Sequence, residues 1–128
     1  MKNLLLILTL LFSTVFFSSP SYAEWTKMTE SVDGDTFYVD FERIRKHDGF
    51  VYYWKLTDYL KLQRVNMSNK TYNQGDCKLF RFKSLSYSFH KQPMGGGTAE
   101  VSNNPDKEWT YPPPKSVAEI TLKQVCNR

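Results

Sequence analysis

The chain contains two cysteines, Cys77 and Cys126, which lie in segments of different character. Cys77 opens the stretch 75–90 (GDCKLFRFKSLSYSFH), whose aromatic and apolar content predicts one long β-strand. Cys126 ends a segment near the C-terminus that has the pattern of a helix. A bond between the two sulfur atoms would hold that helix on that strand, so this pair constrains the fold more than any other feature.

Residues 1–23 have the organisation of a cleavable signal peptide. Lys2 supplies the positive charge, residues 4–17 form the apolar run, and residues 21–23 (SYA) match a small-x-small cleavage site. The run is shorter than the roughly 20 residues that a membrane span requires. We therefore expect export and cleavage after Ala23, with no membrane anchor afterwards. No cysteine lies near this site, so we do not expect a lipoprotein.

Export is the context in which two cysteines form a disulfide bond. The alternatives are a free thiol pair and a metal site. A metal site would need further ligands, and neither of the 2 histidines lies at ligand spacing from a cysteine. We therefore expect a disulfide between Cys77 and Cys126, which should stabilise the domain by about 4 kcal/mol in the chain-entropy model.

Residues 24–128 are enough for one domain and too few for two. Only Lys2 of the 17 basic residues lies in the signal segment, which leaves 16 against 13 acidic residues, a net charge of +3. This excess is small and is spread along the chain. It falls short of the basic footprint of a nucleic-acid-binding protein, so we expect no nucleic acid partner.

Several segments have the composition of β-strands. They include residues 36–41 (TFYVDF) and 50–59 (FVYYWKLTDY), and the turn at 47–49 (HDG) between them predicts a hairpin and antiparallel pairing. Alternating side chains of the second run share a face that we predict to be the core: Phe50, Tyr52, Trp54 and Leu56. Two shorter strands are predicted at residues 25–28 and 98–102.

The sequence between these strands is more polar. Residues 60–74 predict a mobile loop, and residues 93–97 (PMGGG) predict a flexible turn. Within 75–90 the apolar alternation changes phase near Lys83 and Ser84, which predicts a β-bulge or bend there.

The last segment predicts a helix from about Val117 to Val125. Ser116 and Glu119 form a capping-box pattern at its start. Its expected buried side is formed by Val117, Ile120, Thr121 and Val125. The whole pattern predicts an α+β domain, an antiparallel sheet of about five to six strands with one C-terminal helix packed on it and tied by the disulfide.

The sequence shows no catalytic motif, so we do not expect an enzyme, and it predicts no metal or cofactor site. His90, with its neighbours Tyr87 and Lys91, is a candidate for binding an anion or a haem iron. The alternative is a solvent-facing end of a strand. His47 lies in a polar turn, where an exposed histidine without a functional role is expected.

The order of these pieces resembles the surface-adhesin protein E family of bacterial exported proteins. The features that carry the resemblance are the signal, an N-terminal Trp25, Phe37-Tyr38-Val39-Asp40, Trp54 with Asp58, Asp76-Cys77, Tyr87, Met94 with three glycines, Trp109, and a last helix ending in Cys126. The resemblance implies a disulfide-tied sheet and helix and a Gram-negative source. It also implies members that bind host extracellular-matrix proteins and can form homodimers.

From the residues and this resemblance we expect an exported, non-catalytic interaction domain in the periplasm or secreted. Its expected partner is a host matrix protein or a protein of the bacterial envelope. The alternative is a periplasmic carrier for a small, haem-like ligand bound near His90.

Overall fold

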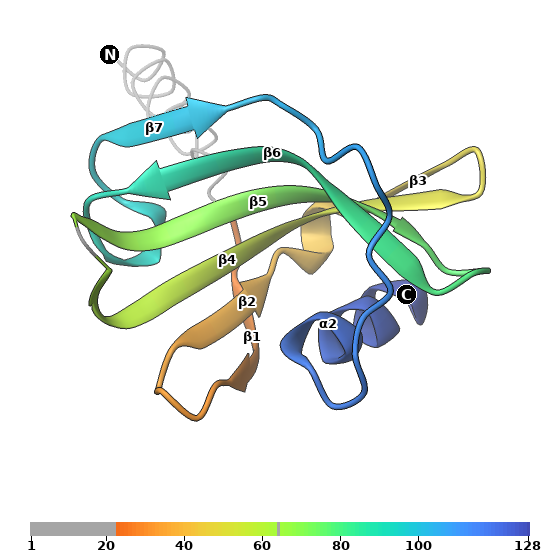
Figure 1. Ribbon diagram of the computed structural model, residues 1–128, viewed down its shortest axis with the longest axis horizontal. Coiled ribbons are helices and arrows are strands. Elements are labelled where there is room, and N and C mark those ends of the chain that lie inside the picture. Colours follow the sequence, from red (N-terminus) through yellow and green to blue (C-terminus); the bar gives the residue numbers. More distant parts are fainter. Residues whose placement is uncertain (1–22, 64) are drawn as a thin grey trace, which may run out of the picture.

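The computed structural model describes residues 23–63 and 65–128. That part of the chain forms a seven-stranded antiparallel sheet with one α-helix after it (Figure 1). The elements are β1 (Thr26–Glu30), β2 (Thr36–Val39), η1 (Phe41–Arg43), β3 (Arg45–His47), β4 (Phe50–Gln63), β5 (Asn66–Asp76), β6 (Arg81–His90), η2 (Pro93–Gly95), β7 (Ala99–Ser102) and α2 (Val117–Cys126). The predicted α+β class is confirmed. The predicted signal peptide lies, except for Ala23, outside the described residues.

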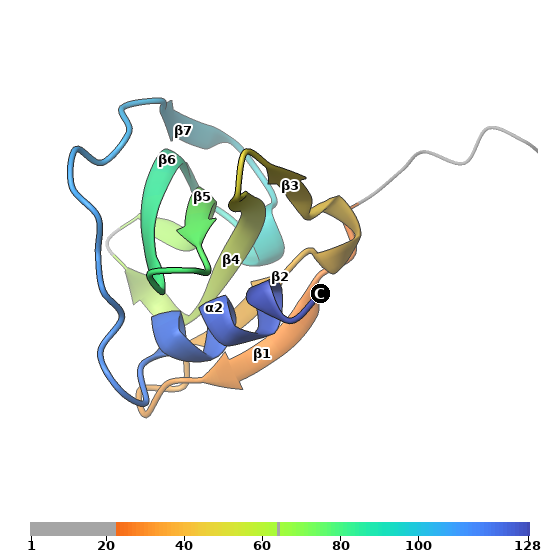
Figure 2. The ribbon, with the colours of Figure 1, turned by 90° about the vertical axis from the view of Figure 1, so that its right-hand side faces the viewer.

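The strands follow the order β1-β2-β4-β5-β6-β7, and β3 pairs with β4 beside the end of β2. Strands β4, β5 and β6 form a meander of long hairpins at the centre. The sheet curls, and α2 lies in its concave side, between β1 and the central strands (Figure 2).

Two expectations about the centre of the sheet are wrong. Residues 75–90 are not one strand, because β5 ends at Asp76 and β6 begins at Arg81. The carboxylate of Asp76 accepts hydrogen bonds from the Leu79 backbone N–H (3.1 Å) and the Arg81 Nε (2.9 Å), which closes a turn between them. Phe80 in this turn has a left-handed backbone, with φ of 51°.

Residues 60–74 are not a loop, because β4 continues to Gln63 and β5 begins at Asn66. This strand is polar along most of its length, so it lacks the apolar alternation that predicts a strand. Its backbone pairs with β4 on one side and β6 on the other. Pairing on both edges satisfies its backbone groups despite the polar sequence.

The predicted bulge is present in β6. Tyr72 of β5 pairs with Ser86, whereas the next residue, Asn73, pairs with Ser84. Leu85 is therefore the extra residue, immediately after the predicted position. Because of the bulge, the alternation of side chains between the two faces of the sheet shifts by one residue between the two halves of β6.

The helix begins as its sequence predicts. The Ser116 hydroxyl oxygen accepts the Glu119 N–H at 3.1 Å, and the Glu119 carboxylate accepts the Lys115 N–H at 3.2 Å. The fully buried side chains are Thr121, Leu122 and Val125. Val117 and Ile120 are only partly buried, so the core-facing side of the helix is rotated toward Leu122 relative to the expectation.

The core under α2 uses the opposite face of β4 from the predicted one. Val51 and Tyr53 are buried against Leu122 and Val125 in one cluster. Gly75 permits this approach, because a Cβ there would lie 2.9 Å from side-chain atoms of both Leu122 and Val51. The four residues predicted as core lie together on the face opposite α2, where Leu56 is fully buried and the three aromatic ones are half-buried.

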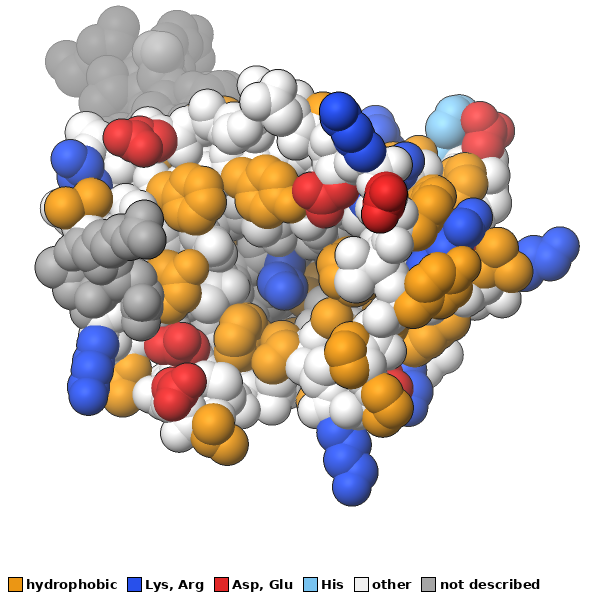
Figure 3. Space-filling model, in the orientation of Figure 1, with side chains coloured by type: hydrophobic (Ala, Val, Ile, Leu, Met, Phe, Trp, Pro, Cys, Tyr) orange, Lys and Arg blue, Asp and Glu red, His pale blue; other side chains and the backbone are white. Residues whose placement is uncertain are grey.

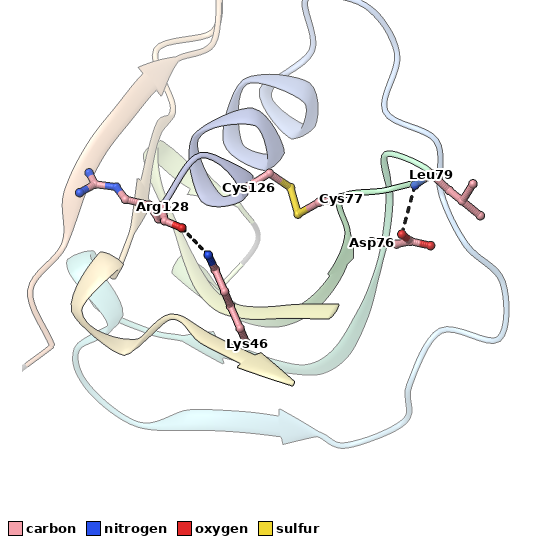
Figure 4. The surroundings of a disulfide bond; sticks show 6 residues. All are labelled: Lys46, Asp76, Cys77, Leu79, Cys126 and Arg128. Atoms are coloured by element: carbon pink, nitrogen blue, oxygen red, sulfur yellow. Dashed lines mark hydrogen bonds between the residues drawn. A yellow bond between two sulfur atoms is a disulfide. The ribbon is translucent and has the colours of Figure 1, made fainter. Parts of the chain in front are cut away.

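The disulfide between Cys77 and Cys126 is confirmed (Figure 4). The two Cα atoms are 5.7 Å apart. The bond joins the β5–β6 turn, rather than the start of one long strand, to the end of α2. Lys46 of β3 adds a hydrogen bond to the backbone oxygen of Arg128, just beyond the helix.

Candidate functional site

The sheet face opposite α2, which we call the open face, carries a row of aromatic side chains. Successive residues on this side of β4 are Phe50, Tyr52 and Trp54, and β5 contributes Tyr72. The ring centroid of Tyr72 lies 4.8 Å from that of Trp54 and 6.1 Å from that of Tyr52. These rings are half-buried and fix one another by stacking. They therefore offer a rigid apolar surface.

The segment between β7 and α2 extends this row. Thr110 pairs with Phe82 of β6 through two backbone hydrogen bonds of 2.8 and 2.9 Å. This pairing sets Trp109 beside β6, where its ring stacks on Phe50 with centroids 5.7 Å apart. A residue far along the chain thus completes the aromatic row.

Basic side chains lie over these rings. The Arg81 guanidinium and the Lys83 ammonium are 4.4 and 4.7 Å from the Trp109 ring centroid. Arg45 lies over Tyr52 at 5.6 Å. Cation–π contacts of this kind are worth about 0.5–1 kcal/mol at exposed sites. They hold the cations in place while leaving their charge available to a partner.

The acidic groups of this region are engaged locally. The Asp76 carboxylate binds Arg81 at 2.9 Å, and Asp40 forms an ion pair with Arg43 at 3.4 Å. Hydrogen bonds from the Leu79 N–H and from Arg81 hold the pKa of Asp76 below its ordinary value, against the effect of burial, so this carboxyl stays charged. Arg81 is consequently the most neutralised cation of the row, and Lys83 and Arg45 carry the more available charge.

A cavity of about 190 Å³ opens at the N-terminal end of the open face. Its lining is mixed: Ala23, Trp25, Asp40, Arg43, Trp54 and Lys70. Asp40 is 1% exposed. The Lys70 ammonium lies 5.9 Å from the Trp25 ring centroid, which repeats the combination of cation and aromatic ring seen at Trp109.

The sequence-predicted residues His90, Tyr87 and Lys91 do not converge. His90 is 7% exposed on the open face, with its Nε2 2.8 Å from the Ser88 hydroxyl oxygen. Burial, and then the charge of Lys70, lower the pKa of His90. Tyr87 lies on the opposite face of β6, and Lys91 is exposed beyond its end. A ligand role for these three residues stays a prediction.

The sequence did not single out the aromatic row as a site. Tyr72 lies in the polar run that we expected to be a loop, and Trp109 is 28 positions beyond Arg81 and 26 beyond Lys83. The available signal was the alternation of Arg81 and Lys83 about Phe82 in β6, since such residues share a face. Their aromatic partner is set by the backbone pairing of Thr110, which leaves no periodic pattern.

Within residues 23–63 and 65–128, no group of three His, Cys, Asp or Glu side chains is placed to hold a metal ion. In the same part of the chain, no helix has the length and apolar character needed to span a membrane.

A curled antiparallel sheet with a C-terminal helix held in its concavity by a disulfide defines a small, covalently stabilised α+β domain. The chain belongs to the surface-adhesin protein E family, whose model matches residues 25–127. A comparison with curated protein sequences gave no significant match.

Solved structures of protein E from Haemophilus influenzae share this fold. Crystal form II is 14% identical, with a TM-score of 0.65, over 86% of this chain and 92% of that one. The selenomethionine form is 15% identical, with a TM-score of 0.64, over 86% of this chain and 91% of that one. At this identity the likeness establishes the architecture alone.

Proposed function

We propose that this chain is an exported, non-catalytic binding domain whose protein partner docks on the open face. The observation that carries the proposal is the row of aromatic rings from Trp54 to Trp109, with basic groups over it. Aromatic and arginine side chains are the residues enriched at the energetic centres of protein interfaces.

The chemistry of this face favours an acidic partner. Arg45, Lys70 and Lys83 would meet carboxylates, while the rings of Tyr52 and Trp109 would bury apolar side chains. The net charge of +3 for residues 24–128 acts in the same direction. Electrostatic complementarity of this kind mainly raises association rate and specificity.

Membership of a family named for surface adhesins supports a binding role outside the cytoplasm. The signal-like residues 1–23, without a lipidation cysteine, favour the periplasm or secretion. We therefore propose a host matrix protein or an envelope protein as the partner. A homodimer remains a further proposal, which sedimentation of the oxidised domain at several concentrations tests.

The haem-carrier alternative gains no support from the arrangement of its candidate residues. His90 is buried, and Tyr87 projects from the other face of the same strand. We do not develop it as a second function.

The binding proposal is tested with the oxidised domain, residues 24–128, immobilised and exposed to matrix proteins and to solubilised bacterial envelope. Trp109→Ala and Lys83→Gln should each weaken capture of the bound protein about tenfold. Lys123→Gln is the matched control, since Lys123 lies on α2, away from the open face. Equal capture by the wild type and Trp109→Ala would contradict the proposal.

A further inference from the structure

The concave face of the sheet, which we call the helix face, has a lysine at its centre. Lys55 of β4 pairs with Val39 of β2 and with Thr71 of β5, so strands flank it on both sides. It belongs to the same face as Val51 and Tyr53, which α2 covers. A charged side chain thus occupies a position where the alternation of the strand points inward.

Lys55 has no acidic partner among the described residues, whose ion pairs all involve other cations. Its recorded contact is the ring of Phe37, whose centroid lies 5.7 Å from the ammonium nitrogen. Burial lowers the pKa of Lys55 below its ordinary value of 10.5, and no carboxylate acts in the opposite direction.

The side chain of Lys55 is partly exposed. The helix packs over Val51 and Tyr53, toward one end of β4. Figure 3 shows a hollow on the side of the molecule that carries α2, with basic side-chain atoms at its floor and both apolar and acidic side chains around its rim. The strand register puts Lys55 two positions beyond Tyr53, past the part of β4 that packs against Leu122 and Val125.

The neutral polar groups around Lys55 already satisfy one another. Asn73 donates to the Thr71 hydroxyl oxygen at 3.0 Å and accepts from the Ser84 hydroxyl at 2.7 Å. All three of these side chains are buried. The ammonium group of Lys55 is therefore the one unmatched charge on the floor of this hollow, as far as the described residues go.

A partly buried cation without a counter-charge is costly, and an anion entering the hollow would reduce that cost. A single lysine matches one negative charge, whereas a phosphate dianion would call for further donors. Phe37, which is only partly buried, provides apolar surface beside the ammonium.

We propose that this hollow binds a small organic acid, whose carboxylate pairs with Lys55 and whose apolar body lies against Phe37. The site is on the opposite side of the sheet from the open face, so the proposal does not depend on the binding role proposed for that face. Loss of one would leave the other intact.

Octanoate and phenylacetate serve as probes, with octanol and phenylacetamide as their uncharged counterparts. Calorimetric titration of the oxidised domain should show binding of the acids, at least tenfold tighter than that of the neutral compounds. Amide signals of Thr71 and Asn73 should shift on binding, and those of Tyr72 and Trp109 on the open face should not. No binding of either acid, or shifts confined to the open face, would overturn the proposal.

Variants separate the charge from the shape of the site. Lys55→Met keeps the length of the side chain and should weaken binding of the acids at least tenfold. Lys70→Met, which removes a cation from the open face, is the matched control and should leave it unchanged. In the wild type, a bound acid should raise the pKa of Lys55, followed by its side-chain nitrogen signal. Equal affinity in Lys55→Met, or an unchanged lysine titration, would show that the charge is not the determinant.

Discussion

The hydroxyl of Tyr87 donates a hydrogen bond of 2.7 Å to the carboxylate of Asp106. The other oxygen of this carboxylate accepts the backbone N–H of Ser84 at 3.0 Å, and the Asp106 N–H donates to the Ser84 carbonyl at 2.8 Å. These bonds fasten the segment after β7 to β6. They hold the chain three residues before Trp109, so a contact on the helix face helps to position a ring on the open face.

Replacing Asp106 with Asn should therefore lower the free energy of unfolding by about 2 kcal/mol, since it weakens hydrogen bonds to a charged group. Burial first, and then the bond to Asp106, raise the pKa of Tyr87 above 10. Asp106→Asn should bring it closer to 10 in a spectrophotometric titration. Asp48→Asn, in an exposed turn, is the control for urea unfolding. An unchanged unfolding midpoint in Asp106→Asn would contradict this role.

Removing the disulfide should cost much of the stability of the domain. Cys77 and Cys126 are separated by 49 positions. Closing a loop of this length lowers the conformational entropy of the unfolded chain, which stabilises the folded domain by about 4 kcal/mol. The double variant Cys77→Ala, Cys126→Ala should unfold at a far lower denaturant concentration. Adding a reductant should destabilise the wild type to a similar level and leave the double variant unaffected. Equal midpoints with and without reductant would refute the prediction.

Gly75 marks the closest approach of β5 to α2. A Cβ at this position would meet Leu122 and Val51 at 2.9 Å, so Gly75→Ala should force the helix outward and cost about 1–3 kcal/mol. Gly49→Asn is the contrast, because nothing lies within 4 Å of a Cβ there and Asn tolerates a left-handed backbone. Thermal unfolding measures both. A larger loss for Gly49→Asn would argue against the packing explanation.

The lowered pKa of Lys55 predicts a pH dependence of stability. Between the folded-state pKa and 10.5 the unfolded state binds more protons, so the wild type should gain stability as pH rises through this window. Lys55→Met lacks this gain. Burial raises the pKa of the neighbouring Tyr53 in both proteins, so its effect cancels in the difference.

Denaturant unfolding at a series of pH values measures the difference between the wild type and Lys55→Met. The free energy of unfolding of the wild type should increase relative to that of Lys55→Met as the pH approaches 10.5. A difference that is constant across this range would show that Lys55 titrates as it does in the unfolded chain.

Local signals in the sequence predicted the helix and the disulfide. The cap formed by Ser116 and Glu119 acts within one turn of the helix. Two cysteines allow only one disulfide within the chain. The bulge in β6 was also predictable, because a change of alternation is a local consequence of one extra residue.

The strand β5 and the face of β4 were not predictable in the same way. The polar side chain of Asn73 in β5 is satisfied by Ser84 on the neighbouring strand, and such a partner follows from pairing that is already formed. On β4, Phe50, Tyr52 and Trp54 face away from α2, and Gly75 leaves room for Leu122 above Val51. The site depends on this choice of face, and so does the inward position of Lys55.

The order of the elements along the chain has a consequence for assembly. The strands β4, β5 and β6 are joined by short turns, so their pairings bring together residues close in sequence and can form early. Cys126 follows every strand of the described fold. The disulfide can therefore form only after the last helix has been synthesised. We expect the β4–β6 meander to be folded by then, so that oxidation stabilises this pairing and does not direct its formation.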